Sequence, residues 1–317
     1  MPAPATMPAP DRPAYGMSIT PFTPDGDIDE PALRRHLRFI ADGGCGVFMG
    51  ALNSGEGFLL TRPEIRRIYE IGVSELSGKA PVFAACLEHT STAIIIELAR
   101  EAAAIGLEGS QLYPPAPADP SAVMTAAEVE RFFRDVCEAV HTPLFLCNYF
   151  HGAVSVDKPG GKIPVDMLAR LVDDYPHVKG VNAGGDPAYL KALIGAVGNK
   201  RPVRTPGGAQ LFLCLELGGH GFISTEPNIA PRLSSRIIET YRAGDRPQAK
   251  ALFDILERLR LLLMRHLYPR SLKPALQHLG FPVGDPRRPF LPLDPAAVRA
   301  IARVLDELDI KRIEGLA

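Results

Sequence analysis

The stretch Gly46-Val47-Phe48-Met49-Gly50-Ala51-Leu52 decides the fold, because it is a short apolar run bounded by glycine and followed by a different periodicity. After Thr61, apolar residues recur at helical spacing over Arg62–Ser77, and Pro81–Leu87 is again short and apolar. Such runs are typical of parallel strands that are buried on both faces. Residues 46–87 therefore predict one strand–helix–strand unit.

The same alternation continues along the chain. It predicts strands at Gly16–Pro21, Gly46–Leu52, Pro81–Leu87, Ser110–Tyr113, Pro143–Tyr149, Val178–Ala183, Pro202–Thr205 and Gly221–Thr225. It predicts helices at Asp29–Ala41, Arg62–Ser77, Ser91–Ile105, Thr125–Val140, Pro164–Asp174, Pro187–Val197, Ala209–Leu217 and Ala230–Arg242. Eight alternations predict an α/β fold, a (β/α)8 TIM barrel over residues 15–243.

The two ends of the chain have other patterns. Residues 1–14 are rich in proline and alanine, which predicts a disordered or extended arm. Residues 244–317 form a C-terminal helical extension, with helices expected at Arg246–Leu267, Arg270–Leu279 and Asp294–Leu308.

Composition excludes several classes of partner. The 35 Lys and Arg residues balance 36 Asp and Glu residues, which argues against nucleic-acid binding and a polybasic membrane patch. No apolar run is long enough to span a membrane. The five cysteines are scattered singly, a pattern that favours reduced thiols in the cytoplasm over disulfides or a cysteine zinc site.

TIM barrels carry their chemistry at the carboxyl ends of the strands. Glu88 and His89, which end the third strand, form the best acid/base pair, although adjacent strand residues point to opposite faces. They would bind a metal only if a third ligand such as Glu56 or Glu226 joined them, so no metal site and no cofactor are predicted. Cys147 is either a nucleophile with His151 as base or a small residue that fills space.

Other strand ends offer hydrogen-bond donors. Asn53, Ser54 and Gly55 form a loop whose backbone N–H groups and side chains suit a carboxylate, or else a plain turn. Asn182 suits an enolate oxygen, and the alternative is a polar filler. Asn148 is a further candidate substrate-binding residue, and Tyr113 is either a phenol donor or an aromatic residue of the rim.

Several motifs, in this order and spacing, resemble the dihydrodipicolinate synthase / N-acetylneuraminate lyase family over about Gly16 to Leu293. They are Ile19-Thr20-Pro21-Phe22, Ser54-Gly55-Glu56 followed by Leu60-Thr61-Arg62-Pro63-Glu64, Gly219-His220-Gly221-Phe222-Ile223-Ser224 with Asn228 and Pro231, Gly244-Asp245 with Ala249, Lys273-Pro274-Ala275-Leu276, and Arg288-Pro289-Phe290-Leu291-Pro292-Leu293. The resemblance implies a barrel with a C-terminal helical extension and a homotetramer or homodimer. It also implies Schiff-base chemistry on a 2-keto acid, with the loop after the second strand binding the carboxylate. Glu56 belongs to a family motif, and we expect it to have a structural role in fixing that loop.

The chain departs from the family at the residues of that chemistry. Asn182 stands where the family has its Schiff-base lysine, and Cys147 stands where it has a relay tyrosine. The second relay tyrosine falls in Pro114-Pro115-Ala116-Pro117, and the carboxylate-binding arginine aligns near Gly152, with His151 as a possible replacement donor. Lys179 lies three residues before Asn182. Because side chains alternate along a strand, this odd offset places the Lys179 side chain on the opposite face, where it is not expected to replace the lysine.

Two hypotheses follow. The first is a lyase-class enzyme that acts on a small, keto-acid-like carboxylate by acid/base chemistry and enolate stabilisation, without an imine. It is motivated by the Ser54-Gly55-Glu56 loop and the polar strand ends. The second is a non-catalytic ligand-binding or scaffold barrel, motivated by the simultaneous loss of four mechanistic residues.

Overall fold

The structure, a computed structural model, describes residues 12–85, 91–115, 124–148, 162–266 and 268–316. Eight parallel strands follow one another in chain order and close into a TIM barrel. The strands are β1 (Ala14–Met17), β2 (Gly46–Met49), β3 (Val82–Ala84), β4 (Gly109–Leu112), β5 (Leu144–Cys147), β6 (Val178–Asn182), β7 (Val203–Pro206) and β8 (Gly221–Ser224). The predicted fold class is confirmed.

A helix follows each strand. These helices are α1 (Glu30–Asp42), α2 (Arg62–Leu76), α3 (Thr92–Ile105), α4 (Ala126–Ala139), α5 (Val165–Asp174), α6 (Pro187–Val197), α7 (Leu211–Glu216) and α8 (Pro231–Arg242). The C-terminal extension consists of α9 (Arg246–Met264), α10 (Leu272–His278), α11 (Pro295–Glu307) and α12 (Ile310–Glu314). No helix in the described part of the chain is long and apolar enough to cross a membrane.

The starts of the helices follow local hydrogen-bonding rules. Thr61 and Thr125 each accept from the backbone N–H of a glutamate three residues later, and that glutamate accepts from the threonine's own N–H. These reciprocal capping boxes satisfy donors that the first turn of a helix leaves without intrahelical partners. The capping box predicted at Thr125 is confirmed.

Some predicted boundaries were wrong. β1 starts at Ala14, inside the predicted arm, and ends before the predicted Pro21. It ends early because the Ile19 N–H donates to Oδ1 of Asn228, 3.1 Å away, and not to a neighbouring strand. The first turn of the seventh predicted helix is a separate 3₁₀ turn, Gly208–Gln210, and the short helix α12 was not predicted. Residues 1–11 of the predicted arm lie outside the described residues.

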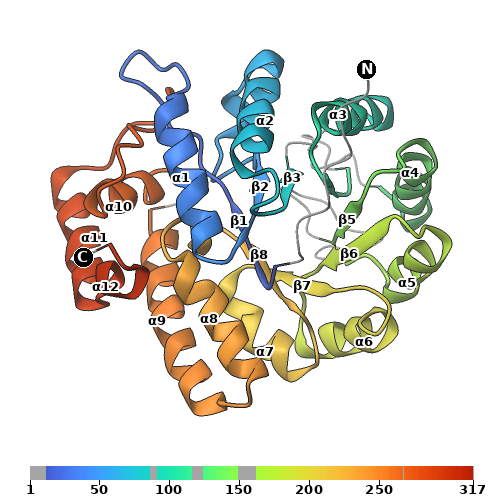
Figure 1. Cartoon of the computed structure of the whole chain (residues 1–317). Helices are drawn as coiled ribbons and strands as arrows, with labels where there is room; N and C mark the ends of the chain where they lie inside the picture. Colours follow the sequence, from blue (N-terminus) through green and yellow to red (C-terminus); the bar gives the residue numbers. More distant parts are fainter. Residues whose placement is uncertain (1–11, 86–90, 116–123, 149–161, 267, 317) are drawn as a thin grey trace. The chain divides into compact units, whose positions relative to one another are not determined.

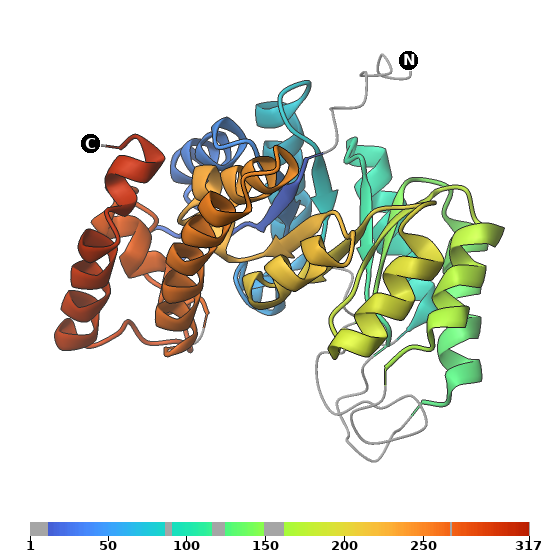
Figure 2. The same ribbon diagram turned by 90° about the horizontal axis from the view of Figure 1, so that it is seen from below.

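The chain forms two compact units, Met1–Val82 with Ser224–Ala317, and Phe83–Ile223. In the second unit, the apolar side chains of β4–β7 that face outward pack against the surrounding helices, which Figure 1 shows as the green to yellow ribbons α4–α6. In the first unit, α8 and α9 run side by side, and the red helices of the extension lie next to α9 (Figures 1 and 2). The described cysteines, Cys45, Cys137, Cys147 and Cys214, are buried and form no disulfide with one another.

A buried ion pair joins the loop after β2 to the C-terminal extension. Nζ of Lys273, on α10, lies 2.5 Å from Oε1 of Glu56, and both side chains are fully buried. Glu56 has a left-handed backbone (φ 54°), which is uncommon for a non-glycine residue. Burial raises the pKa of Glu56 and lowers that of Lys273 to about 8, while each charge favours the ionised form of the other. The predicted structural role of Glu56 is confirmed.

Two further sets of contacts reinforce the ion pair between Glu56 and Lys273. The Arg287 N–H donates to Oε2 of Glu56 at 2.7 Å, and its guanidinium bonds the carbonyl of Gly26 and the carboxylate of Glu64. The Phe22 ring lies 4.3 Å from Nζ of Lys273 and 4.3 Å from Cζ of Arg287. The loops after β1 and β2 are thereby fixed to one segment of the C-terminal extension.

The end of the extension supplies a long-range helix cap. Both carboxylate oxygens of Glu314, on α12, accept from the backbone N–H groups of Arg232 and Leu233 at 2.9 and 3.0 Å. These donors belong to the first turn of α8, whose own N-cap residue, Ala230, has no side chain able to accept them. Burial raises the pKa of Glu314 to about 7, against the lowering effect of the two N–H groups, Arg232 and Arg236.

Removal of one charge of the buried Glu56–Lys273 ion pair should destabilise the protein. We expect Lys273→Met to lower the free energy of unfolding by about 3–5 kcal/mol, because it leaves the Glu56 carboxylate buried without its cation. The double variant Glu56→Gln/Lys273→Met should recover most of this loss, as measured by urea denaturation. A double variant no more stable than the single one would contradict the ion-pair account.

Lys250→Met is the matched control. Its amine lies 2.5 Å from Oδ1 of Asp254, but both side chains are more than half exposed. Loss of an exposed pair of this kind should change the free energy of unfolding by only about 0–1 kcal/mol.

Stability should also depend on pH through Glu314. Because its pKa is raised on folding from 4.5 to about 7, its contribution is full below pH 4.5 and is lost as the pH rises through 7. Between about pH 5 and about pH 8, the free energy of unfolding of the wild type should fall by about 2–3 kcal/mol relative to Glu314→Gln. Parallel pH curves for the two proteins would refute this. Glu307→Gln, at an exposed position, should run parallel to the wild type.

Candidate functional site

Alternation along the strands of the second unit separates two sets of side chains. Leu112, Leu144, Leu146, Val181 and Val203 belong to the apolar layer between strands and helices. The residues between them point to the opposite face, into the barrel. This inward set comprises Gln111 on β4, Phe145 and Cys147 on β5, Gly180 and Asn182 on β6, and Arg204 on β7.

The strand register brings two predicted site residues together. Cys147 pairs with Asn182, and Asn182 pairs with Arg204 on the next strand. Asn182 is 1% exposed, and its Oδ1 has no hydrogen-bond partner in the part of the chain that the structure describes. The Cζ atom of Arg204 lies 5.8 Å from the centroid of the Phe145 ring. An amide, a thiol and a guanidinium thus occupy adjacent inward positions.

Asn148 is predicted to bind substrate, but its side chain bonds the protein. Nδ2 donates to the carbonyl of Gly184 at 2.8 Å, and Oδ1 accepts from the Gly184 N–H at 2.9 Å. Nδ2 also lies 3.2 Å from the hydroxyl of Tyr189, which donates to the Ile163 carbonyl. Burial raises the pKa of Tyr189 to about 12, so this phenol stays protonated near neutral pH. Asn148 therefore fixes the loop after β6.

A second carboxamide holds the next residue of that loop. Nε2 of Gln210 lies 2.5 Å from the carbonyl oxygen of Gly185, and Oε1 accepts from the Gly185 N–H at 3.2 Å. Asp186 then caps α6 by accepting from the N–H of Tyr189, and it also binds Lys162 at 2.8 Å. The backbone that follows Asn182 is therefore held from both sides, which restricts the position of the Asn182 side chain.

In the first unit, the predicted loop after β2 packs onto β1. The Ser54 hydroxyl donates to the Met17 carbonyl at 2.9 Å, and the Gly55 carbonyl accepts from the Thr20 hydroxyl at 2.7 Å. A Cβ atom at Gly55 would lie 2.9 Å from the Ser18 carbonyl oxygen, so only glycine fits. Asn53 is exposed. The proton of Ser54 is thus used within the fold, while the Asn53 side chain faces solvent.

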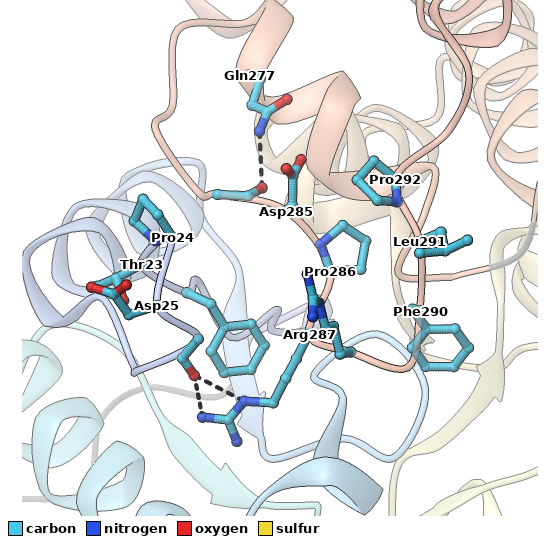
Figure 3. A pocket seen from close by; sticks show the side chains of 14 residues that line it. Thr23, Pro24, Asp25, Gln277, Asp285, Pro286, Arg287, Phe290, Leu291 and Pro292 are labelled. Atoms are coloured by element: carbon cyan, nitrogen blue, oxygen red, sulfur yellow. Dashed lines mark hydrogen bonds between the residues drawn. The ribbon is translucent and has the colours of Figure 1, made fainter.

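A pocket of about 800 Å³ also lies in the first unit. The loop after β1, including Thr23 and Asp25, and the segment from Gly284 to Pro292 line it (Figure 3). The guanidinium of Arg287 points to the Gly26 carbonyl, and Gln277 donates to the Gly284 carbonyl. None of the predicted site residues lines this pocket.

Three predicted residues, Glu88, His89 and His151, lie outside the described residues. Tyr113 directly follows β4 and is 7% exposed. The sequence analysis did not indicate Arg204 and Gln111, which lie inside the short predicted strands Pro202–Thr205 and Ser110–Tyr113. A charged or amide residue inside a short strand could have indicated them. The apolar residues of such a strand pack outward against the helices, so the polar residue between them faces the barrel interior.

Most of the chain resembles one family of known proteins. Residues 14–308 match the model of the dihydrodipicolinate synthetase family. A 4-hydroxy-tetrahydrodipicolinate synthase from Methanopyrus kandleri is 30% identical over 275 residues, covering 86% of this chain and 88% of that protein. One from Symbiobacterium thermophilum is 30% identical over 299 residues, covering 92% and 96%.

A solved structure agrees with the sequence comparisons. The 4-hydroxy-tetrahydrodipicolinate synthase from Methylacidiphilum fumariolicum SolV superposes with a TM-score of 0.84 at 26% identity, covering 97% of this chain and 99% of that one. The family match extends over the barrel and over the C-terminal extension as far as Leu308. The chain therefore belongs to the dihydrodipicolinate synthetase family.

Proposed function

We propose that the chain is a lyase-class enzyme that acts on a small, keto-acid-like carboxylate without forming a Schiff base. The observation that carries this proposal is Asn182 at the carboxyl end of β6. The nitrogen lone pair of an amide is delocalised into its carbonyl group, so this side chain cannot attack a ketone as an amine does. Oriented amide groups can instead stabilise the negative charge of an enolate.

The positions of the lysines support the absence of an imine. Among the described residues, the one fully buried lysine side chain is Lys273, which pairs with Glu56. Lys179 is exposed near the amino end of β6, and its amine donates to the Pro176 carbonyl at 2.9 Å. Lys162 pairs with Asp186 at the surface. None of these three amines has the inward position of Asn182.

The proton transfers of the proposed reaction need groups other than the described carboxamides. Glu88 and His89 remain the proposed acid and base, since a carboxylate and an imidazole can exchange a proton near neutral pH. Cys147, beside Asn182, is a third proposed participant. Asn53, Ser54 and Gly55 remain predicted carboxylate contacts. The Asn53 amide faces solvent, whereas the Ser54 hydroxyl donates to the Met17 carbonyl.

Borohydride trapping tests the mechanism directly. Treatment with pyruvate and sodium borohydride should give no covalent mass adduct, because no amine stands at position 182. An adduct mapped to any lysine of the wild type would overturn the proposal. Asn182→Lys is the matched control, since it places an amine at this position. An adduct at residue 182 in that variant would show that the reagents reach it.

A second candidate function is a non-catalytic ligand-binding barrel. It is favoured by the side chains of Asn148 and Gln210, which bond the backbone of Gly184 and Gly185 and so contribute to rigidity instead of proton transfer. A rigid polar interior is sufficient for binding and supplies no acid or base by itself.

Ligand consumption separates the two functions. A thermal-shift screen of keto, hydroxy and unsaturated acids should find ligands that raise the melting temperature. Incubation of each hit with catalytic amounts of protein should then consume one of them, as followed by NMR. A hit that stays intact over hours would exclude the enzyme in favour of the binding protein.

A further inference from the structure

His36, on α1, is buried where three elements of the first unit meet. It is 0% exposed, and its Nε2 lies 2.9 Å from Oδ1 of Asn228, in the 3₁₀ turn η3 (Glu226–Asn228) that follows β8. The same oxygen accepts from the N–H of Ile19, just beyond β1, at 3.1 Å. One amide oxygen therefore connects α1, the segment after β1 and η3.

The hydrogen bonds of Asn228 determine which nitrogen of the His36 ring carries the proton. The Asn228 amino group donates to the carbonyls of Met17 and Thr225, both at 2.8 Å, so the atom that faces His36 is the amide oxygen. An amide oxygen can only accept, so Nε2 of His36 is the donor. Nδ1 is then left as an acceptor, and it is buried without a hydrogen-bond partner within the described part of the chain.

A second proton on this ring has no acceptor. It would sit on Nδ1 and place a charge next to the rings of Phe39 and Phe281, whose centroids lie 6.5 and 6.2 Å from that of His36. A buried charge without a counter-ion is strongly disfavoured. Burial accordingly lowers the pKa of His36 from 6.5 to about 4, against the raising effect of the bond to Asn228.

Charged groups of the neighbouring elements bind partners other than His36. Glu75, on α2, pairs with two arginines of α1 that are partly exposed. Glu226, on η3, accepts from a serine hydroxyl at the end of β8, and Arg232, on α8, lies beside the carboxylate that caps that helix. On α1 itself, Arg35 lies over the phenylalanine ring that follows α10. None of these charges acts on the pKa of His36, so among the described residues its imidazolium has no counter-ion.

We propose that His36 is an acid-sensitive latch for residues 18–22, the segment that follows β1. While the ring is neutral, its bond to Asn228 holds α1 and this segment to η3. When Nδ1 takes a proton from the solvent, the imidazolium must reach water, and the contact with Asn228 opens. The released segment includes Phe22, which lines the pocket of the first unit, so the latch acts on one wall of that pocket.

Three backbone N–H groups report on this segment. Those of Ser18 and Phe22 donate to carbonyls on β2 and after α10, at 2.9 and 3.3 Å, and that of Ile19 donates to Asn228. A segment held by a few separate hydrogen bonds can open locally, without unfolding of the sheet. Hydrogen exchange of these three amides therefore measures opening of the latch.

Hydrogen–deuterium exchange at about pH 7.5 and about pH 5 tests the proposal. Because folding lowers the pKa of His36 from 6.5 to about 4, the closed state is fully favoured above pH 6.5 and loses this advantage as the pH falls. After correction for intrinsic exchange, the protection of residues 18–22 in the wild type should fall about 30-fold relative to His36→Gln. Glutamine keeps a donor for Asn228 and does not titrate.

The comparison region is β6, in the second unit, whose protection should change equally in the wild type and in His36→Gln. A fall of about 30-fold in both regions would indicate global unfolding, and it would overturn the latch just as an unchanged segment 18–22 would. His278→Gln is the matched control, because it alters a histidine that pairs with Asp306 away from this junction. Its exchange should follow the wild type at both pH values.

Nitrogen NMR of the histidine rings keeps the proposal testable if His36→Gln fails to fold. The wild type should show a ring that keeps the Nε2–H tautomer, with a bare Nδ1, down to about pH 5. Protonation of every histidine ring in the folded protein at that pH would refute the latch.

Discussion

The ion pair between Glu56 and Lys273 is the contact on which the geometry of the first unit depends. It is fully buried, and it holds a glutamate in a left-handed backbone conformation that the residue would otherwise avoid. A paired buried charge is tolerated only when its partner stays in place. The loop after β2 and helix α10 are consequently fixed to one another, although more than 200 residues separate them in the chain.

Around this pair, charged residues connect distant segments of the chain, whereas apolar residues form the layer between strands and helices. Arg287 bonds Gly26 and Glu64, and it shares the Phe22 ring with Lys273. In the second unit, apolar side chains on one face of the strands pack against the helices, while the other face presents polar residues such as Asn182 and Arg204, together with Phe145, to the barrel interior. The interior is therefore the part in which chemistry can change while the outer layer preserves the fold.

The sequence predicted the barrel because strand and helix periodicities depend on local patterns. It also indicated Asn182 and Cys147 as strand-end residues, which the structure confirms, and Asn148, which directly follows β5. It did not predict that the Asn148 amide bonds Gly184, because the direction of a side chain at a strand end depends on the next loop. Glu314, with its helix α12, was missed for the same reason: it caps α8 from 81 residues away, and no local pattern marks such a partner.

The carboxamides of Asn148 and Gln210 have a consequence for the loop that follows β6. Each presents one donor and one acceptor to a single residue, which is the pattern that a neighbouring peptide group presents within a sheet. The loop is thus ordered as if the sheet continued, while its residues need no strand propensity and are glycines at 184 and 185. The side chains of Asn148 and Gln210 thus extend the hydrogen-bonding pattern of the sheet beyond the end of β6, where the backbone no longer pairs with a neighbouring strand.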